Sequence, residues 1–488
     1  MNSSSLVRTT FLAACVFFGY AVGRAEAQGP RTNVLLILID DLNDQIGCLG
    51  GAGITPHIDR LAQRGTLFAN AHTQAPWCAP SRTSLLTGKR PSTTGIYTLS
   101  PWFREVPALR GLVTLPQYFS AHGYGTFGAG KVFHDGHPPE KDAATEFDAM
   151  GYRGKHFPPA PVRPLVNAPG VRQDFGVFPE KDGEQEDWKV VDSAIAQLEK
   201  KRTKPFFISV GIRRPHYPLF ASAHWFSLYD LAKIWLPEVP AADRDDLPRF
   251  AHALRLGNGE PTLPALAAAG LWRQHNHAYF ACMSFADSQV GRLLEALEKT
   301  GEAERTIVVL TSDHGFHLGE KQLFAKRTLW ERATRVPLIF AGPGVGRGTS
   351  RRTVELLDIY PTLAAACRLP APVGTEGESL GALLRDPSAP RVRPAITGQM
   401  RGNFAVRSEE WRYIRYADGS EELYDHQRDP NEFRNLADDP QHAATKAEMG
   451  KWIPANPAEP VPGSERTAGG FLTYADGVAR LNGERIEL

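Results

Sequence analysis

The sequence predicts an α/β fold with a large, mostly parallel β-sheet, followed by a smaller C-terminal domain that contains an antiparallel sheet. Residues 33–39 (NVLLILI) are an unbroken apolar run, which is typical of a central strand buried on both faces. Similar runs alternate with helical patterns as far as about residue 341, and this alternation is typical of a doubly wound sheet. Beyond about residue 391, short segments flanking the turn Asp418-Gly419 indicate antiparallel hairpins instead.

The individual elements follow from local patterns. Three further apolar runs resemble the first and are expected to be strands of the same sheet: 204–211, 306–312 and 336–341. Thr55-Pro56 predicts the start of a helix, because Thr is a good N-cap and Pro is tolerated in the first turn. Apolar residues at helical spacing predict longer helices over 187–201 and 277–299. In the C-terminal part, residues 404–408 and 411–416 are predicted strands.

Size and charge exclude several classes of protein. The chain has 488 residues, enough for two or three domains, and its 55 Lys and Arg against 54 Asp and Glu give a net charge of +1. This balance argues against nucleic acid or an anionic membrane surface as the main partner. Beyond the N-terminus there is no apolar run of about 18 residues, so no transmembrane segment is expected in the mature chain.

The N-terminus has the pattern of an export signal. Arg8 precedes an apolar stretch at 11–22, and Ala25-Glu26-Ala27 has the small-x-small form of a cleavage site. The expected organisation is a signal peptide at 1–27, a catalytic domain at 28–390, and a C-terminal domain with an extended tail at 391–488. We therefore expect a periplasmic or secreted protein. Lipoprotein anchoring at Cys15 is the less favoured alternative, since that residue lies early in the apolar stretch.

Acidic residues follow two of the predicted strands. Asp40-Asp41 ends the first apolar run, and Asp313-His314 ends the run at 306–312. An isolated Asp-Asp pair more often caps a helix or begins a loop, but two acidic clusters at strand ends of one sheet favour a shared cation site. Carboxylate oxygens suit Ca²⁺ or Mg²⁺, with His314 as a possible nitrogen ligand. Another polar cluster, 213–216 (RRPH), follows the run at 204–211.

Cys78 lies in the segment Cys78-Ala79-Pro80-Ser81-Arg82, where Pro80-Ser81 predicts the beginning of a helix. A cysteine at the positive end of a helix is favoured as a thiolate, although a lone cysteine is more often a small buried apolar residue. Cys78 and the other three cysteines of the mature chain form no CxxC pair; the others are Cys48, Cys282 and Cys367.

The C-x-P-S-R segment, followed by Leu-Thr-Gly-Lys-Arg at 86–90, resembles the signature of the type I, formylglycine-dependent sulfatases. The acidic clusters stand upstream and downstream of it in the order found in that family. Within the family, the likeness is strongest to the branch of iduronate-2-sulfatase and its bacterial relatives. It extends over 33–42, 78–97, 130–134, 214–216, 279–294 and 312–315. The resemblance implies an alkaline-phosphatase-like sandwich fold.

The resemblance also implies a cofactor and a metal. A formylglycine-generating enzyme would oxidise Cys78 to formylglycine, whose hydrate is the nucleophile. Asp40, Asp41, Asp313 and His314 would bind Ca²⁺, with modified Cys78 completing the ligand set. His314 replaces the Asn found in many sulfatases but matches the iduronate branch, whereas Phe316 departs from that branch, which has Trp there.

Roles for five further residues follow from the same resemblance. Arg82 would hold the aldehyde hydrate and the metal ligands, while Lys131 and Lys326 would bind sulfate oxygens. His216, together with Lys326, would protonate the leaving alcohol, and His134 would act as a base during sulfate elimination. Taken alone, each lysine could be a solvated loop residue and each histidine a structural one.

The expected function is hydrolysis of sulfate esters on sugars, within sulfated polysaccharides or glycosaminoglycan-like oligosaccharides. The loops at 135–185 and 221–270 are expected to hold the determinants of specificity. One alternative is a phosphate or phosphonate monoester hydrolase on the same scaffold, although ligands for only one metal are recognisable. Another is a non-catalytic glycan-binding homologue whose cysteine is never oxidised.

Overall fold

The computed structural model of the protein describes residues 31–155, 160–254, 260–464, 472–481 and 483–487. The predicted signal peptide and Cys15 lie outside these described residues. Residues Thr32–Leu488 form one compact unit. The predicted division of the mature chain at 390/391 therefore stays a prediction. Among the described helices, none has the length and apolar character required to cross a membrane.

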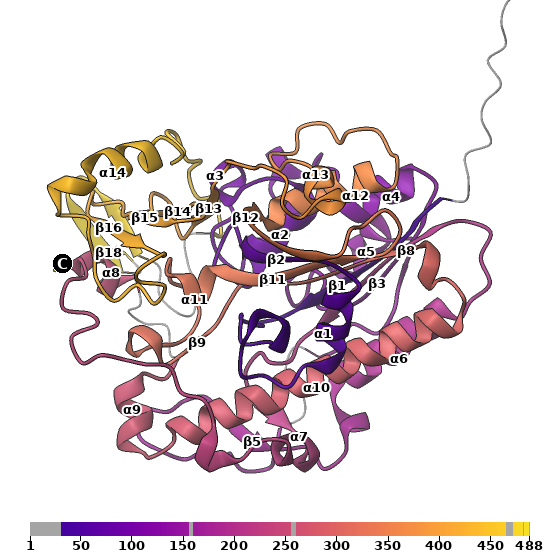
Figure 1. Cartoon of the computed structure of the whole chain (residues 1–488), viewed down its shortest axis with the longest axis horizontal. Helices are drawn as coiled ribbons and strands as arrows, with labels where there is room; N and C mark the ends of the chain where they lie inside the picture. The colour runs from indigo at the N-terminus through magenta and orange to yellow at the C-terminus, as the bar shows by residue number, and fades with distance from the viewer. Residues whose placement is uncertain (1–30, 156–159, 255–259, 465–471, 482, 488) are drawn as a thin grey trace, which may run out of the picture. The chain divides into compact units, whose positions relative to one another are not determined.

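An eight-stranded sheet forms the centre of this unit (Figure 1). All its neighbouring strands run parallel except where β11 pairs with β8 and β2. In spatial order the strands are β12 (Gly348–Glu355), β2 (Gly65–His72), β11 (Arg335–Ala341), β8 (Thr306–Ser312), β1 (Asn33–Ile39), β6 (Phe206–Ile212), β3 (Gly125–Gly130) and β4 (Ala149–Met150). The predicted α/β class with a large, mostly parallel sheet is confirmed.

The central strand β1 is buried along its whole length, as its apolar run predicts. Leu35, Ile37 and Ile39 belong to the core on one face of the sheet. The alternate residues of β1, among them Leu36 and Leu38, belong to the core on the other face. Successive side chains of a strand point to opposite faces, so a strand covered on both sides must be apolar at every position.

The strand β11 corrects one expectation. Its apolar run at 336–341 was expected to be another parallel strand, but it runs antiparallel to both of its neighbours. The chain leaves β8 at Ser312 and returns as β11 at Arg335 after short elements, without a long helix that would carry it back across the sheet. Antiparallel neighbours allow such a return, whereas parallel ones need a crossover. An apolar run indicates burial on both faces but not strand direction.

Helices cover both faces of the sheet (Figure 1). The long helix α10 packs against α1 and α6 on one face, and α2 lies among α4 and α12 on the other. The bounds are α1 (Pro56–Gln63), α2 (Cys78–Thr87), α4 (Leu115–Ala121), α6 (Glu186–Leu198), α10 (Trp272–Lys299), α12 (Ile359–Ala366) and α13 (Gly381–Arg385). Helices predicted from Pro56, over 187–201 and over 277–299 are therefore present, the last one beginning five residues earlier.

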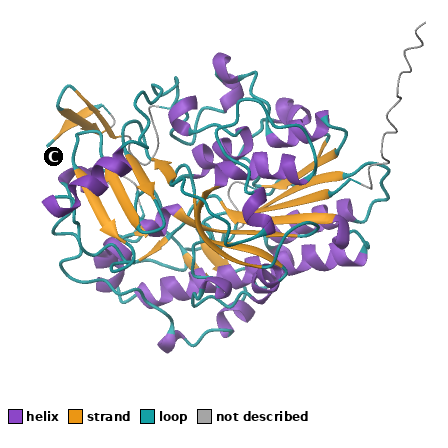
Figure 2. Cartoon of the chain, turned by 45° about the horizontal axis from the view of Figure 1, so that its top comes forward, coloured by secondary structure: helices purple, strands orange, loops and turns teal. Residues whose placement is uncertain are grey.

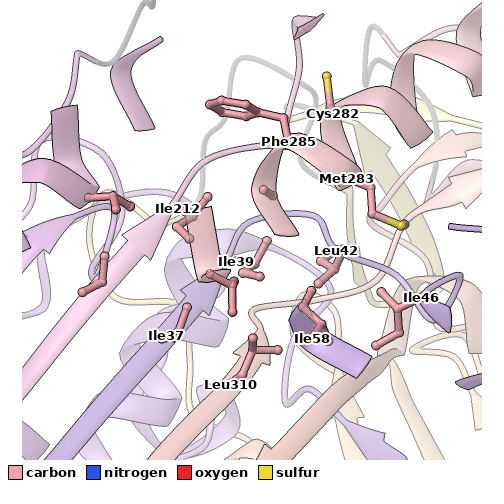
Figure 3. Packing of buried hydrophobic residues seen from close by; sticks show 14 of the residues in the cluster. Ile37, Ile39, Leu42, Ile46, Ile58, Ile212, Cys282, Met283, Phe285 and Leu310 are labelled. Atoms are coloured by element: carbon pink, nitrogen blue, oxygen red, sulfur yellow. The ribbon is translucent and has the colours of Figure 1, made fainter. Parts of the chain in front are cut away.

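Figure 3 shows how α10 packs on the sheet. Met283 of this helix points toward Leu42 and Ile46, just beyond the end of β1, whereas Phe285 points away from the strands and contacts Trp225. Cys282 is part of the same cluster and is fully buried. The apolar surface removed from water here holds the helix against the end of the sheet at which β1 finishes.

The C-terminal region contains the predicted antiparallel sheet (Figure 2). Its strands, in order, are β13 (Ala395–Gly398), β14 (Phe404–Arg407), β15 (Trp411–Arg415) and β16 (Glu421–Asp425), with α14 (Ala443–Gly450) packed on β15. This sheet joins the large one through β13: Thr397 Oγ1 donates to the carbonyl of Thr73, and the N–H of Gly398 donates to the carbonyl of Gln74.

The final segment was expected to be an extended tail. Residues 454–464 do run along α3 (Pro91–Thr94), where the N–H of Ala458 donates to the carbonyl of Ser92. A three-stranded antiparallel sheet that was not predicted follows, formed by β17 (Leu472–Ala475), β18 (Val478–Leu481) and β19 (Glu484–Ile486).

Candidate active site

The polar clusters identified in the sequence meet at one edge of the large sheet. The strands β8, β1, β6 and β3 are neighbours and run parallel, so their carboxyl ends lie together. Predicted site residues follow each of the four within four residues of the strand end: Asp313 and His314 after β8, Asp40 and Asp41 after β1, His216 after β6, and Lys131 and His134 after β3. In open α/β sheets this edge is where ligands bind.

Cys78 begins helix α2 and points into this cluster. Its Sγ lies 3.3 Å from Nε2 of His314 and 3.6 Å from Oδ1 of Asp40. The ammonium groups of Lys326 and Lys131 lie 3.4 Å and 3.6 Å from the same sulfur. The helix starts at Cys78 itself, two residues before the predicted start, so the side chain occupies the positive end of the helix.

Arg82, one turn along α2, joins the acidic clusters. Its Nε donates to Oδ2 of Asp313 over 2.8 Å, and its Nη2 lies 3.4 Å from Oδ1 of Asp40. The guanidinium also donates to the carbonyls of Lys131 and Val132. All ten residues of α2 are buried, so Arg82 is a fixed internal cation.

Lys131 reaches the site because two glycines allow β3 and β6 to approach closely. Gly130 has a φ of +68°, and a Cβ there would lie 2.0 Å from the carbonyl oxygen of Gly211. The main-chain N–H of Lys131 donates to that carbonyl over 3.0 Å. The Lys131 ammonium contacts Oδ2 of Asp40 and lies 3.7 Å from Oδ2 of Asp135.

Lys326 comes from a different part of the chain. It directly follows β10 (Phe324–Ala325), which pairs with β9 (His317–Leu318) just beyond the Asp313-His314 cluster. Its ammonium donates to Oδ1 of Asp41. The two lysines therefore approach Cys78 from separate elements, each in contact with one member of the Asp40-Asp41 pair.

His216 and His134 are the most accessible of the predicted residues; both are partly exposed, whereas all the others are buried. Nδ1 of His216 lies 2.7 Å from the carbonyl of Tyr217, and its Nε2 lies 4.0 Å from Oδ2 of Asp41. Burial lowers the pKa of His134, while its interaction with Cys78 acts in the opposite direction. The site thus opens to solvent beside these two imidazoles.

The electrostatic environment sets Cys78 apart from the other described cysteines. Burial raises the pKa of its thiol, but Lys131, Lys326 and His314 outweigh burial and hold this pKa well below its usual value. Burial raises the pKa of Cys48 and Cys282 to about 12 and that of Cys367 to about 11. Only a thiolate is nucleophilic, so among these four cysteines the site activates Cys78 alone.

The three carboxylates of Asp40, Asp41 and Asp313 supply oxygen donors, which suit a hard divalent cation. Asp40, Asp41, Cys78 and His314 each offer an atom within 4.8 Å of the other three. Asp313 stands beside this group, with its Oδ2 3.5 Å from Nε2 of His314. Among the residues that the structure describes, none gives the buried Oδ2 of Asp41 a hydrogen bond, whereas buried carboxylate oxygens normally have a partner.

The pKa values of the buried carboxylates also favour the binding of a cation. Burial raises the pKa of Asp313 to about 6 although Arg82 opposes it. Burial and Cys78 act in the same direction on Asp40, but Lys131, His216 and Arg82 bring its pKa below the usual value. The protein's own cations therefore compensate these acids unequally, and a bound cation would favour the charged form of each.

A second acidic group lies at the contact with the C-terminal sheet. Glu331, His426 and Glu432 also offer atoms within 4.8 Å of one another. Here, however, Arg412 and Arg407 already form ion pairs with the carboxylates. With its charge matched by two guanidinium groups, this cluster is an internal ion-pair network that joins the two sheets rather than a second metal site.

Several residues without a distinctive sequence motif also support the site. The carboxylate of Asp187, at the start of α6, accepts the main-chain N–H groups of Arg213 and Arg214, each over 2.8 Å. Arg213 in turn forms an ion pair with Asp135. The sequence showed Asp187 only as the beginning of a helix, because the acceptor role of its side chain depends on how α6 packs beside β6.

Phe316 proves to be structural. It is fully buried, and its ring stacks on Tyr279 with centroids 4.9 Å apart. Phe316 therefore packs between α10 and the strand tips. Elsewhere in the chain, the ring of Trp102 stacks on His137, and the N–H of His57 donates to Asp287.

Comparison with known proteins agrees with this geometry. The model of the Sulfatase family matches residues 32–368, more than half of the chain. The chain belongs to the sulfatase family. A second family model, the C-terminal region of N-sulphoglucosamine sulphohydrolase, matches residues 319–456. This sulfatase is therefore an enzyme that hydrolyses sulfate esters, as the C-x-P-S-R segment led us to expect.

Two relatives show where this sulfatase lies in the family. A sulfatase of Formosa agariphila is 39% identical over 85% of this chain and 84% of its own length. Human iduronate 2-sulfatase is 34% identical over 74% of this chain and 73% of its own. The expected likeness to the iduronate-2-sulfatase branch is confirmed.

Similarity to one solved structure gives information about the fold alone. The phosphonate monoester hydrolase of Agrobacterium radiobacter superposes with a TM-score of 0.72 at 21% identity, covering 86% of this chain and 94% of that chain. The predicted alkaline-phosphatase-like architecture is confirmed, and hydrolases of different esters share it. The fold by itself therefore does not identify the ester that is cleaved.

Proposed function

We propose that this sulfatase hydrolyses sulfate esters on sugars, in sulfated polysaccharides or glycosaminoglycan-like oligosaccharides, with oxidised Cys78 as the nucleophile. The observation that carries the proposal is the position of the Cys78 sulfur, within 3.6 Å of two ammonium groups, a carboxylate and an imidazole. A relative named iduronate 2-sulfatase supports a sugar substrate.

Asp40, Asp41, Asp313 and His314 would hold a Ca²⁺ ion, and oxidised Cys78 would complete the ligand set. The three carboxylates support this assignment, as does Oδ2 of Asp41, which has no hydrogen-bond partner within the described part of the chain. The bound ion would polarise a sulfate oxygen and lower the pKa of a bound hydroxyl. Conversion of Cys78 to formylglycine by a formylglycine-generating enzyme would supply a hydrated aldehyde, with one hydroxyl for attack on sulfur and a second whose deprotonation releases sulfate.

The remaining site residues would stabilise negative charge or transfer protons. Arg82, fixed between Asp40 and Asp313, holds the acidic ligands in place. Lys131 and Lys326 flank Cys78 and would bind the sulfate oxygens, where they stabilise the negative charge of the transition state. His216 and His134 lie at the solvent-exposed side of the site. The sugar would remain on this side while the nucleophile attacks the sulfur of its sulfate group.

The two imidazoles have separate tasks. Because Nδ1 of His216 is paired with the carbonyl of Tyr217, its Nε2 is left facing Asp41 and would give a proton, with Lys326, to the departing alcohol. His134, whose pKa is lowered by burial, is suited to accept a proton from the second hydroxyl.

The last part of the proposal is that the enzyme is exported from the cytoplasm. The N-terminal pattern supports cleavage before Gln28 and a periplasmic or secreted enzyme. The mass of the mature protein tests it: a chain that begins at Gln28 is expected, whereas a lipid-modified chain that begins at Cys15 would contradict it.

The central experiment combines mass spectrometry with sulfate release. The tryptic peptide containing residue 78 should have the mass of the aldehyde form, and purified enzyme should release sulfate from defined sulfated oligosaccharides. Cys78→Ala should abolish turnover. Cys282→Ala, a change of another fully buried cysteine, is the matched control and should retain it. Full activity in Cys78→Ala would overturn the proposal.

The same panel separates the alternatives. Phosphate and phosphonate monoesters should react orders of magnitude more slowly than sulfate esters, because the recognisable ligands serve one metal ion. A preference for phosphate would establish the monoester hydrolase instead. Glycan binding without sulfate release, together with an unmodified Cys78, would establish the non-catalytic homologue.

A further inference from the structure

The backbone at Asp41 has an unusual conformation. Its φ is +63°, in the left-handed region that residues with a side chain seldom adopt. Were the chain extended here, the side chains of Asp40 and Asp41 would point to opposite faces of the sheet. Instead both carboxylates meet the same cluster: Oδ1 of Asp40 lies 3.6 Å from Sγ of Cys78, and Oδ1 of Asp41 lies 3.3 Å from Nδ1 of His314.

Tyr279 of helix α10 spans this turn. Its hydroxyl donates to the carbonyl of Asp41 over 2.7 Å and accepts the N–H of Asn43 over 3.0 Å. The side chain is fully buried, and its ring is fixed by stacking on Phe316. Asn43 itself donates from Nδ2 to the carbonyl of Phe316. One hydroxyl thus satisfies two main-chain groups on either side of Leu42.

Ser312, the last residue of β8, binds the same turn from the other side. Its Oγ accepts the N–H of Leu42 over 3.0 Å and donates to the carbonyl of His314 over 2.8 Å. This hydroxyl therefore couples the loop that bears Asp41 to the loop that bears His314. Buried main-chain polar groups normally need a partner, and the hydroxyls of Tyr279 and Ser312 supply partners to four such groups in these two loops.

We propose that Tyr279 and Ser312 are positioning residues of the metal site, which hold the Asp41 main chain in its left-handed conformation and so direct both acidic side chains at one ion. This inference rests on the proposed function, in which that site binds Ca²⁺. Neither residue belongs to the group of side chains proposed to bind the ion. Groups that orient metal ligands in this way commonly contribute about 10- to 100-fold to metal affinity.

Calcium binding by the chelator-treated full chain tests the proposal, with isothermal titration calorimetry and Tb³⁺ luminescence as readouts. Tyr279→Phe keeps the ring but removes both hydrogen bonds, and its Kd for Ca²⁺ should rise about 10-fold or more. Activity of this variant should recover as Ca²⁺ is raised. Tyr229→Phe is the matched control, because the Tyr229 hydroxyl also accepts a main-chain N–H, that of Ile54, and pairs with Ser284.

Ser312→Ala gives a second test that does not depend on the folding of the tyrosine variant. Its matched control is Ser193→Ala, since Ser193 likewise accepts a main-chain N–H, from Tyr152, and donates to a carbonyl, that of Val190. We expect weaker Ca²⁺ binding in Ser312→Ala and unchanged binding in Ser193→Ala.

The outcomes are distinguishable. Wild-type enzyme that binds no Ca²⁺ would overturn the metal assignment of the proposed function. If wild type binds Ca²⁺ and both Tyr279→Phe and Ser312→Ala bind it within twofold of their controls, the positioning role alone is overturned. Weaker binding in both variants, with controls unchanged, supports it.

Discussion

The guanidinium of Arg82 donates from Nε to Oδ2 of Asp313 over 2.8 Å, and neither side chain is more than 1% exposed. The pair joins the helix that begins with Cys78 to the strand tip that bears His314. Its partners come from positions 231 residues apart, so it exists only in the folded chain.

Arg82→Ala should therefore damage both stability and activity. Removal of one partner from a buried ion pair leaves the other charge uncompensated, which typically costs about 3–5 kcal/mol in the free energy of unfolding. Urea denaturation measures this loss, and sulfate release should fall at least about 100-fold, as for loss of a preorganised electrostatic contact. Arg64→Ala is the control. Arg64 pairs with Glu298 at the surface, where such pairs contribute at most about 1 kcal/mol.

His216→Ala should discriminate between leaving groups. A general acid matters most when the departing alkoxide is a strong base, so hydrolysis of sugar sulfates should fall about 10²- to 10⁴-fold. An aryl sulfate with an acidic phenol needs little protonation and should lose much less. The measurement is kcat/KM across a series of esters of graded leaving-group pKa. An equal loss for every ester would refute the role as acid.

Removal of the metal should lower thermal stability. An ion that binds only the folded chain stabilises it by about 2.7 kcal/mol when present at 100 times its Kd. Chelation should therefore lower the Tm, and added Ca²⁺ should restore it. Asp41→Asn should weaken this response to Ca²⁺, because it replaces a carboxylate ligand. A Tm that is independent of Ca²⁺ in the wild type would contradict the metal assignment.

The stability of the protein should also decrease between about pH 4 and pH 7 because of Asp287. Burial raises the pKa of this carboxyl to about 7, against a value of 3.8 when unperturbed, although it accepts the N–H groups of His57 and Ile58 at the start of α1. The folded state therefore binds more protons than the unfolded state in this window, so the free energy of unfolding falls as the pH rises.

Asp287→Asn should flatten that part of the pH profile, since the amide oxygen can still accept these bonds but carries no charge. Urea denaturation at a series of pH values measures the change. Asp438→Asn, at an exposed turn, serves as the control and should leave the profile as in the wild type. An unchanged slope in Asp287→Asn would show that other groups cause the pH dependence.

Much of the fold could be predicted because burial on both faces leaves a clear mark on a strand. The run at 33–39 coincides with β1, and that at 306–312 with β8. The direction of β11 could not be predicted, because an apolar run is the same whichever way the strand points. The small sheet of β17, β18 and β19 was missed, since its short strands have no long apolar pattern.

The sequence by itself determined which side chains are available for chemistry: the acidic residues at strand ends, the cysteine at the start of a helix, and their order along the chain. Only the tertiary structure decided how they meet. The left-handed turn at Asp41 depends on Tyr279, a residue of a helix more than two hundred positions away. Such bonds have no local pattern, because they form between groups that become neighbours only after the helix has packed on the sheet.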